Sequence, residues 1–101
     1  MRGGRRAVVA GIGAITAAGV GVETFWRACI EARSALRLPT GPDFACFGDL
    51  PAGEVAEPVP PGEDRVASLA VASAAEPIDA AGSTGLGLPP ASGITLGTCL
   101  G

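Results

Sequence analysis

Residues with little side chain to bury make up nearly half of this sequence, and this limits what it can fold into. Glycine, alanine and proline together account for 44 of the 101 residues. Only 26 residues are large and apolar, counting Val, Ile, Leu, Met, Phe and Trp. A chain of this length forms one domain at most, and its core is modest even when bulky residues are plentiful. We therefore expect a poorly filled core.

Five residue types are absent from the sequence: His, Lys, Tyr, Asn and Gln. Without His or Lys, this chain alone cannot assemble a Ser–His or Cys–His pair or a Lys Schiff base. The absence of His also argues against a zinc site. Seven arginines against ten acidic residues give a net charge of −3, whereas nucleic-acid binding calls for a basic surplus. We expect no metal, no cofactor, no nucleic-acid partner and no catalysis by this chain alone.

The three cysteines, Cys29, Cys46 and Cys99, follow no disulfide or metal-ligand spacing. This pattern predicts reduced thiols and a cytoplasmic protein. Cys29 is expected in the core and Cys46 is expected to have no role. Cys99 follows a predicted strand, but a reactive thiolate needs a base or a cation beside it, and none is near in the sequence. We therefore expect no catalytic cysteine.

The N-terminus also fits a secretory signal, which is an alternative from another class of protein. Three arginines before residue 7 precede an uncharged stretch over residues 7–22, with small residues at Ala17 and Ala18 where cleavage would occur. The stretch contains no Leu, and each of its four glycines costs a helix roughly 1 kcal/mol. It is also too short and too weakly apolar to span a membrane, so no membrane association is expected.

The order of patterns along the chain predicts an α/β structure with one incomplete domain over residues 1–101. The expected parts are a strand, a glycine turn and a first helix over residues 6–37, an irregular stretch over 38–62, a second helix over 63–82, and a strand with a glycine turn over 92–101. The strands are expected at Arg6–Ala10 and Gly93–Gly97, both buried on two faces.

The two helices are predicted from their apolar spacing and caps. The first runs from about Val22 to Arg33, with one apolar face formed by Val22, Phe25, Trp26, Cys29 and Ile30. The second runs from about Asp64 to Ala75, with Glu63 or Asp64 near its cap. Pro77 removes a helical hydrogen bond, so this helix should end near Ala75 or kink there.

The glycine turn Gly11-x-Gly13 is typical in part of a dinucleotide-binding loop. That loop needs a third glycine where this chain has Thr16, and a helix that begins at the turn rather than about ten residues later. We prefer the interpretation that these glycines permit a sharp turn and close packing. Nucleotide binding remains an alternative that nucleotide-induced stabilisation would test.

Three sequence blocks, spread over residues 11–101, resemble the start of one enzyme family. They are Gly11-Ile-Gly13-Ala-Ile-Thr16-Ala-Ala-Gly19-Val-Gly21 with the following Phe25-Trp26, the Ala-rich stretch Asp64–Glu76 with Asp79-Ala-Ala-Gly82, and Gly93-Ile-Thr-Leu-Gly97-Thr-Cys-Leu-Gly101. In this order they resemble the N-terminal portion of β-ketoacyl-acyl-carrier-protein synthases, which belong to the thiolase-like superfamily. Pro77 departs from the family pattern, in which the second helix usually continues.

The resemblance implies a partial thiolase-like layered α/β/α/β/α fold, with only the first strands and helices present. Family members condense an acyl group with a malonyl-type extender on acyl carrier protein, in fatty-acid or polyketide synthesis. They act as homodimers or heterodimers, without metal or redox cofactor, and use a Cys and two His that lie well downstream. A non-catalytic partner subunit of the chain-length-factor type is the alternative within the family.

The two expected strands have a physical consequence. If both are interior strands, their backbone groups and apolar faces need neighbours that this chain does not provide. We therefore expect the isolated chain to be loosely folded or prone to aggregate.

Overall fold

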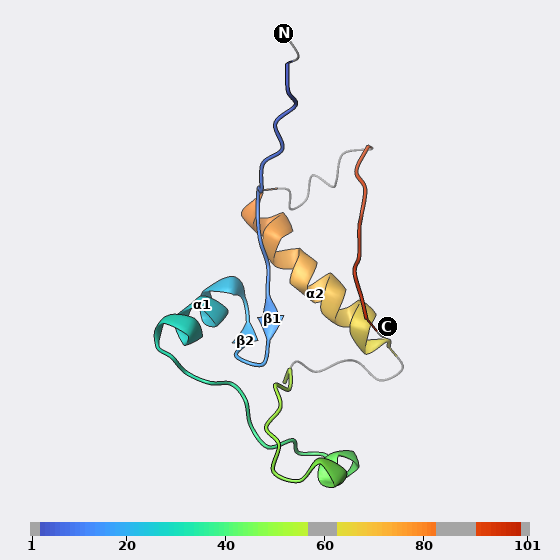
Figure 1. Ribbon diagram of the computed structural model, residues 1–101. Helices are drawn as coiled ribbons and strands as arrows, with labels where there is room; N and C mark the ends of the chain where they lie inside the picture. Colours follow the sequence, from blue (N-terminus) through green and yellow to red (C-terminus); the bar gives the residue numbers. More distant parts are fainter. Residues whose placement is uncertain (1–2, 57–62, 83–90, 100–101) are drawn as a thin grey trace.

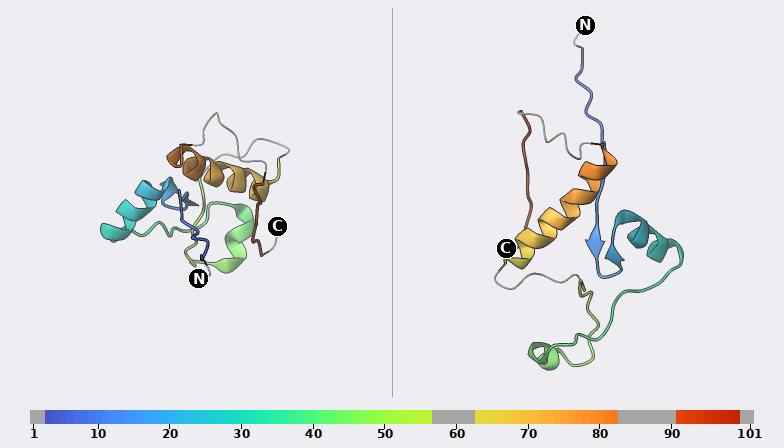
Figure 2. Two further views of the ribbon diagram at one scale, coloured as in Figure 1. Left: turned by 90° about the horizontal axis from the view of Figure 1, so that it is seen from above. Right: turned by 180° about the vertical axis from the view of Figure 1, so that it is seen from behind.

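The computed structural model describes residues 3–56, 63–82 and 91–99, and it places a small hairpin between two helices (Figure 1). The elements are β1 (Ile15–Thr16), β2 (Gly19–Val20), α1 (Val22–Ile30), a 3₁₀ helix η1 (Pro42–Phe47) and α2 (Arg65–Ala80). The view from behind shows the same arrangement, with α1 on one side of the hairpin and α2 on the other (Figure 2).

The glycine-rich stretch forms a hairpin, which sequence analysis did not predict. β1 and β2 are antiparallel, with Ile15 opposite Val20 and Thr16 opposite Gly19. Gly19 has a φ of 134°, a conformation that favours glycine, and the Thr16 hydroxyl accepts a hydrogen bond from the Ala18 N–H at 3.1 Å. The predicted glycine turn therefore contains two very short paired strands, and the Thr16 hydroxyl binds the backbone of the loop between them.

The helix predicted from Val22 is confirmed, but it ends at Ile30 rather than near Arg33. The reason is a left-handed residue after the helix, Ala32, with a φ of 51°. The Ala32 N–H donates to the Cys29 carbonyl and the Arg33 N–H to the Ala28 carbonyl, at 3.2 and 2.9 Å. These two bonds form a Schellman-type end, with alanine at the position that glycine usually holds.

The expected inner face of α1 is wrong. Ala28, 8% exposed, is the one buried residue in the part of the chain that the structure describes. Phe25, Trp26, Cys29 and Ile30 are exposed, Trp26 to 61%. α1 therefore packs against the rest of the molecule through Ala28. No described segment covers the broader apolar face of the helix.

The predicted second helix is also confirmed, with a later end. Asp64 is its N-cap, and the Asp64 carboxylate accepts from the N–H groups of Val66 and Ala67. The helix does not end near Ala75, since it continues through Pro77 to Ala80. Because proline has no N–H, the Ser73 carbonyl lacks its usual partner four residues later, yet the last turn of α2 still forms.

The predicted strands at Arg6–Ala10 and Gly93–Gly97 are wrong. Neither segment is a strand, and both are exposed, with Val8 at 85% and Ile94 at 87%. A strand needs a hydrogen-bonded neighbour, and the described residues provide none for either segment. Both segments run in the same direction, opposite to α2 (Figures 1 and 2).

The stretch predicted as irregular, 38–62, holds more structure than expected. It contains η1, and an isolated antiparallel bridge joins Arg37 to Ala52 just across its boundary. Residues 57–62 lie outside the described residues, as do Leu100 and Gly101 of the last predicted block. None of the described helices has both the length and the apolar character to cross a bilayer.

Candidate functional site

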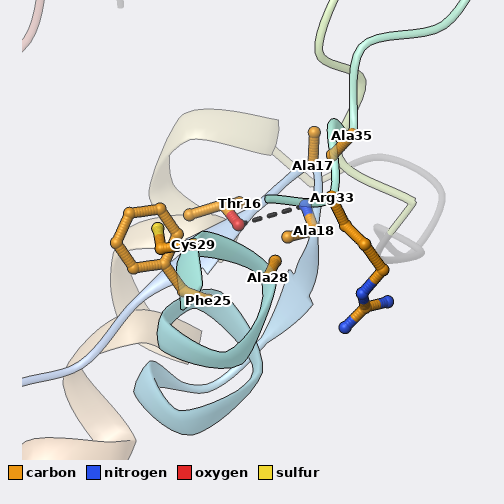
Figure 3. Close-up of a pocket in the computed structure, with 8 residues that line it drawn as sticks. All are labelled: Thr16, Ala17, Ala18, Phe25, Ala28, Cys29, Arg33 and Ala35. Carbon is orange, nitrogen blue, oxygen red and sulfur yellow. Dashed lines mark hydrogen bonds between the residues drawn. The ribbon is translucent and has the colours of Figure 1, made fainter. Parts of the chain in front are cut away.

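A small hollow beside α1 is the candidate site (Figure 3). It has a volume of about 250 Å³. The lining residues come from the hairpin turn, one side of α1 and the loop after it: Thr16, Ala17, Ala18, Phe25, Ala28, Cys29, Arg33 and Ala35. Figure 3 shows Phe25 and Cys29 at one end and the Arg33 side chain at the other. Most of these side chains are small or apolar, so the hollow suits a small apolar group.

The charged residue at this hollow is already paired. The Arg33 Nε donates to a Glu31 carboxylate oxygen at 2.6 Å, and both side chains are largely exposed. The Cys29 thiol has no His or Lys to activate it, since the chain contains neither. The arrangement can hold a small group but offers no general base and no activated nucleophile.

The other two cysteines do not form a site either. Cys46 and Cys99 are exposed free thiols, as is Cys29. Cys29 was expected in the core, and that prediction is wrong because the face of α1 that carries it is uncovered. The described residues contain no group of His, Cys, Asp or Glu that could hold a metal ion.

One residue that sequence analysis missed positions the hairpin. The Glu76 carboxylate, on α2, accepts from the Ala14 N–H at 3.2 Å and from the Val22 N–H at 3.0 and 3.2 Å. These two amides lie just before β1 and at the first residue of α1. In the sequence, Glu76 stands out only as a charged residue near the end of an Ala-rich helix.

This contact also bears on nucleotide binding. In dinucleotide-binding loops, the free N–H groups at the helix start hold a phosphate. Here the first N–H of α1, from Val22, is held by the Glu76 carboxylate, an anion of the protein itself. A phosphate at that position would have to displace this carboxylate.

The glycines of the turn pack against α2. A Cβ added to Gly11 would overlap the Pro77 carbonyl oxygen, and one added to Gly13 would overlap the Ser73 carbonyl oxygen. The same added atom on Gly13 would lie 2.6 Å from the Pro77 Cδ. The preferred interpretation of Gly11-x-Gly13 is confirmed for close packing. The sharp turn expected at these two glycines is wrong, because residues 11–14 form no turn and the chain reverses at Ala17 and Ala18.

No protein-family model, curated protein or solved structure matches this chain. Its function therefore has to be inferred from the residues and contacts described above.

Proposed function

We propose that this chain is the N-terminal part of a β-ketoacyl synthase-like acyltransferase. The parent protein would condense acyl and malonyl thioesters on acyl carrier protein, in fatty-acid or polyketide synthesis, as a homodimer or heterodimer. The chain itself would carry none of the catalytic residues, because it contains no His and its cysteines have no activating neighbour.

The observation that carries this proposal is the packed glycine turn in front of α1. The family motif places two glycines after an apolar segment and a Phe-Trp pair on the helix that follows, as Gly11, Gly13, Phe25 and Trp26 do here. Both glycines have a steric reason in the structure, since a side chain at either would overlap α2. This contact gives a steric reason for glycine at these two positions of this chain.

A second observation supports a role as part of a larger domain. The apolar face of α1 is exposed, and so are Val8 and Val9 in the N-terminal segment. Soluble proteins normally cover a contiguous apolar face such as that of α1. The further strands and helices of a layered domain would cover them.

The proposal is tested on the native product in its source cells. An antibody raised against residues 63–82 would capture the product, and its intact mass would be measured. We expect a mass several-fold above 9.9 kDa, with a Cys and two His in the additional sequence. The captured protein should condense acyl-carrier-protein-bound acyl and malonyl groups, and a thiol-blocking reagent should abolish the reaction.

Other outcomes separate the alternatives. A large product without the Cys, inactive alone, would indicate the non-catalytic partner subunit. A native mass of 9.9 kDa would leave a chain without catalytic machinery and contradict the proposal. A mass lower by residues 1–18 would favour the secreted alternative.

A further inference from the structure

A second cavity lies next to the hollow and shares Ala17 and Ala35 with it. Its volume is about 300 Å³, and most of its lining residues are exposed, so it is an open hollow on the surface with room for a small molecule. It lies where the loop after α1 meets the segment after η1. The remaining lining residues are Arg37, Leu38, Thr40, Ala52, Glu54, Val55 and Ala56.

A pair of backbone hydrogen bonds joins the two walls of this cavity. The Arg37 N–H donates to the Ala52 carbonyl at 3.0 Å, and the Ala52 N–H donates to the Arg37 carbonyl at 2.8 Å. Residues paired in this way across an antiparallel bridge project their side chains to the same face. Glu54 is two residues beyond Ala52 and lines the same cavity as Arg37. The bridge therefore brings the cation of Arg37 and the anion of Glu54 to one side.

These two opposite charges line the same cavity without pairing. Among the described residues, the ion pairs are Arg27–Glu23 and Arg33–Glu31, and neither Arg37 nor Glu54 has a side-chain hydrogen bond or ion pair. Both charges are therefore available to one ligand.

We propose that this cavity binds a small zwitterion with an apolar side chain, which is the chemistry of a free aliphatic α-amino acid. The ligand carboxylate would pair with the Arg37 guanidinium and accept from the Thr40 hydroxyl. Its ammonium would pair with Glu54, and its side chain would lie against Leu38 and Val55. Charge-assisted bonds to a carboxylate are among the stronger hydrogen bonds in proteins. This site goes beyond the proposed function and does not depend on it.

The test compares three ligands of similar size on the full chain. L-leucine carries both charges, 4-methylpentanoate lacks the ammonium, and 3-methylbutylamine lacks the carboxylate. Binding is followed by amide chemical-shift changes at residues 37–40 and 52–56. We expect L-leucine to bind at least tenfold more tightly than either analogue. Equal binding of all three ligands, or no binding of L-leucine, would overturn the proposal.

Two variants assign the charges to their partners. Glu54→Gln should weaken the binding of L-leucine about tenfold and leave the binding of 4-methylpentanoate unchanged. Arg37→Gln should weaken the binding of L-leucine and leave the binding of 3-methylbutylamine unchanged. Arg33→Gln is the matched control, because Arg33 lines the neighbouring hollow and is already paired with Glu31. Each analogue that still binds shows that the cavity of that variant is intact. Unchanged L-leucine binding in either test variant would contradict the role proposed for that residue.

Discussion

At the scale of single residues, the structure distinguishes glycines that the packing requires from glycines in open space. Gly11 and Gly13 lie directly against the backbone of α2, whereas Gly97 has nothing within 4 Å of an added Cβ. All three glycines belong to the sequence blocks that suggested a function, and composition alone does not separate them. Only the contact with α2 shows which ones are constrained.

Replacing Gly13 with alanine should open the contact between the turn and α2. The added Cβ would overlap the Ser73 carbonyl, and overpacking of this kind costs about 1–3 kcal/mol. Amide hydrogen exchange at Ala14 and Val22 should become about tenfold faster or more, because both N–H groups are protected through this contact. Gly97→Ala is the control and should change neither rate. Unaltered exchange in Gly13→Ala would show that the packing is not needed.

At the scale of elements, the two helices begin in different ways. α2 has a local cap, since Asp64 precedes it and accepts from two of its first N–H groups. α1 is preceded by Gly21, which has no side chain to cap it, and its first N–H is bound by Glu76 from α2. The cap of α2 was predictable from adjacent sequence, but the cap of α1 comes from a residue 54 positions away.

The local cap of α2 should respond to the loss of its oxygen. Asp64→Ala is expected to weaken the first turn of α2 by about 1 kcal/mol, because two backbone N–H groups lose their acceptor. Asp64→Asn should be nearly neutral, since Asn caps about as well as Asp. Exchange rates of the Val66 and Ala67 amides measure the effect. Equal rates in the alanine and asparagine variants would contradict a capping role.

The distant cap should matter more widely, because it joins three elements. Glu76→Ala leaves the Ala14 and Val22 N–H groups without an acceptor, at a cost of about 1–3 kcal/mol. Exchange at both amides should rise at least tenfold together. Glu76→Gln keeps one acceptor oxygen, so its exchange rates at these two amides should lie between those of the wild type and those of the alanine variant. Glu63→Ala is the control, because among the described residues the Glu63 carboxylate accepts only from the Ser68 hydroxyl. A rise at one amide only would show that Glu76 does not couple them.

The helices were predictable from sequence and the strands were not. Apolar spacing located α1 and α2 because helical hydrogen bonds form within one segment. The segments at Arg6–Ala10 and Gly93–Gly97 have the composition of strands, but a strand needs a partner. The hairpin was missed because its strands have two residues each, too few for alternation to show.

At the scale of the whole molecule, the described chain is extended rather than compact. Its radius of gyration is 17.6 Å, against about 13 Å for a compact domain of this length. Large apolar residues from several elements are exposed, and a single alanine is buried among the residues that the structure describes. The expected shortage of core material is therefore visible as a shortage of buried surface.

The isolated chain should accordingly unfold without a sharp transition. Ellipticity at 222 nm is expected to fall gradually on heating, because few buried contacts must break together. A dye that binds exposed apolar surface should fluoresce with the unheated protein. A steep thermal transition of the soluble monomer, without dye binding, would contradict both expectations and the proposal that further elements cover this chain.

The sequence by itself located the two helices, narrowed the N-cap of α2 to Glu63 or Asp64 and contains no histidine or lysine, because each of these depends on residue identity or on neighbours along the chain. The tertiary structure alone decided which side of α1 is buried, where Glu76 binds and why Gly11 and Gly13 must be glycine. These features depend on contacts between segments up to 66 residues apart, such as that of Gly11 and Pro77. Local propensity acts over one or two turns, whereas burial and distant hydrogen bonds depend on which surfaces meet in space.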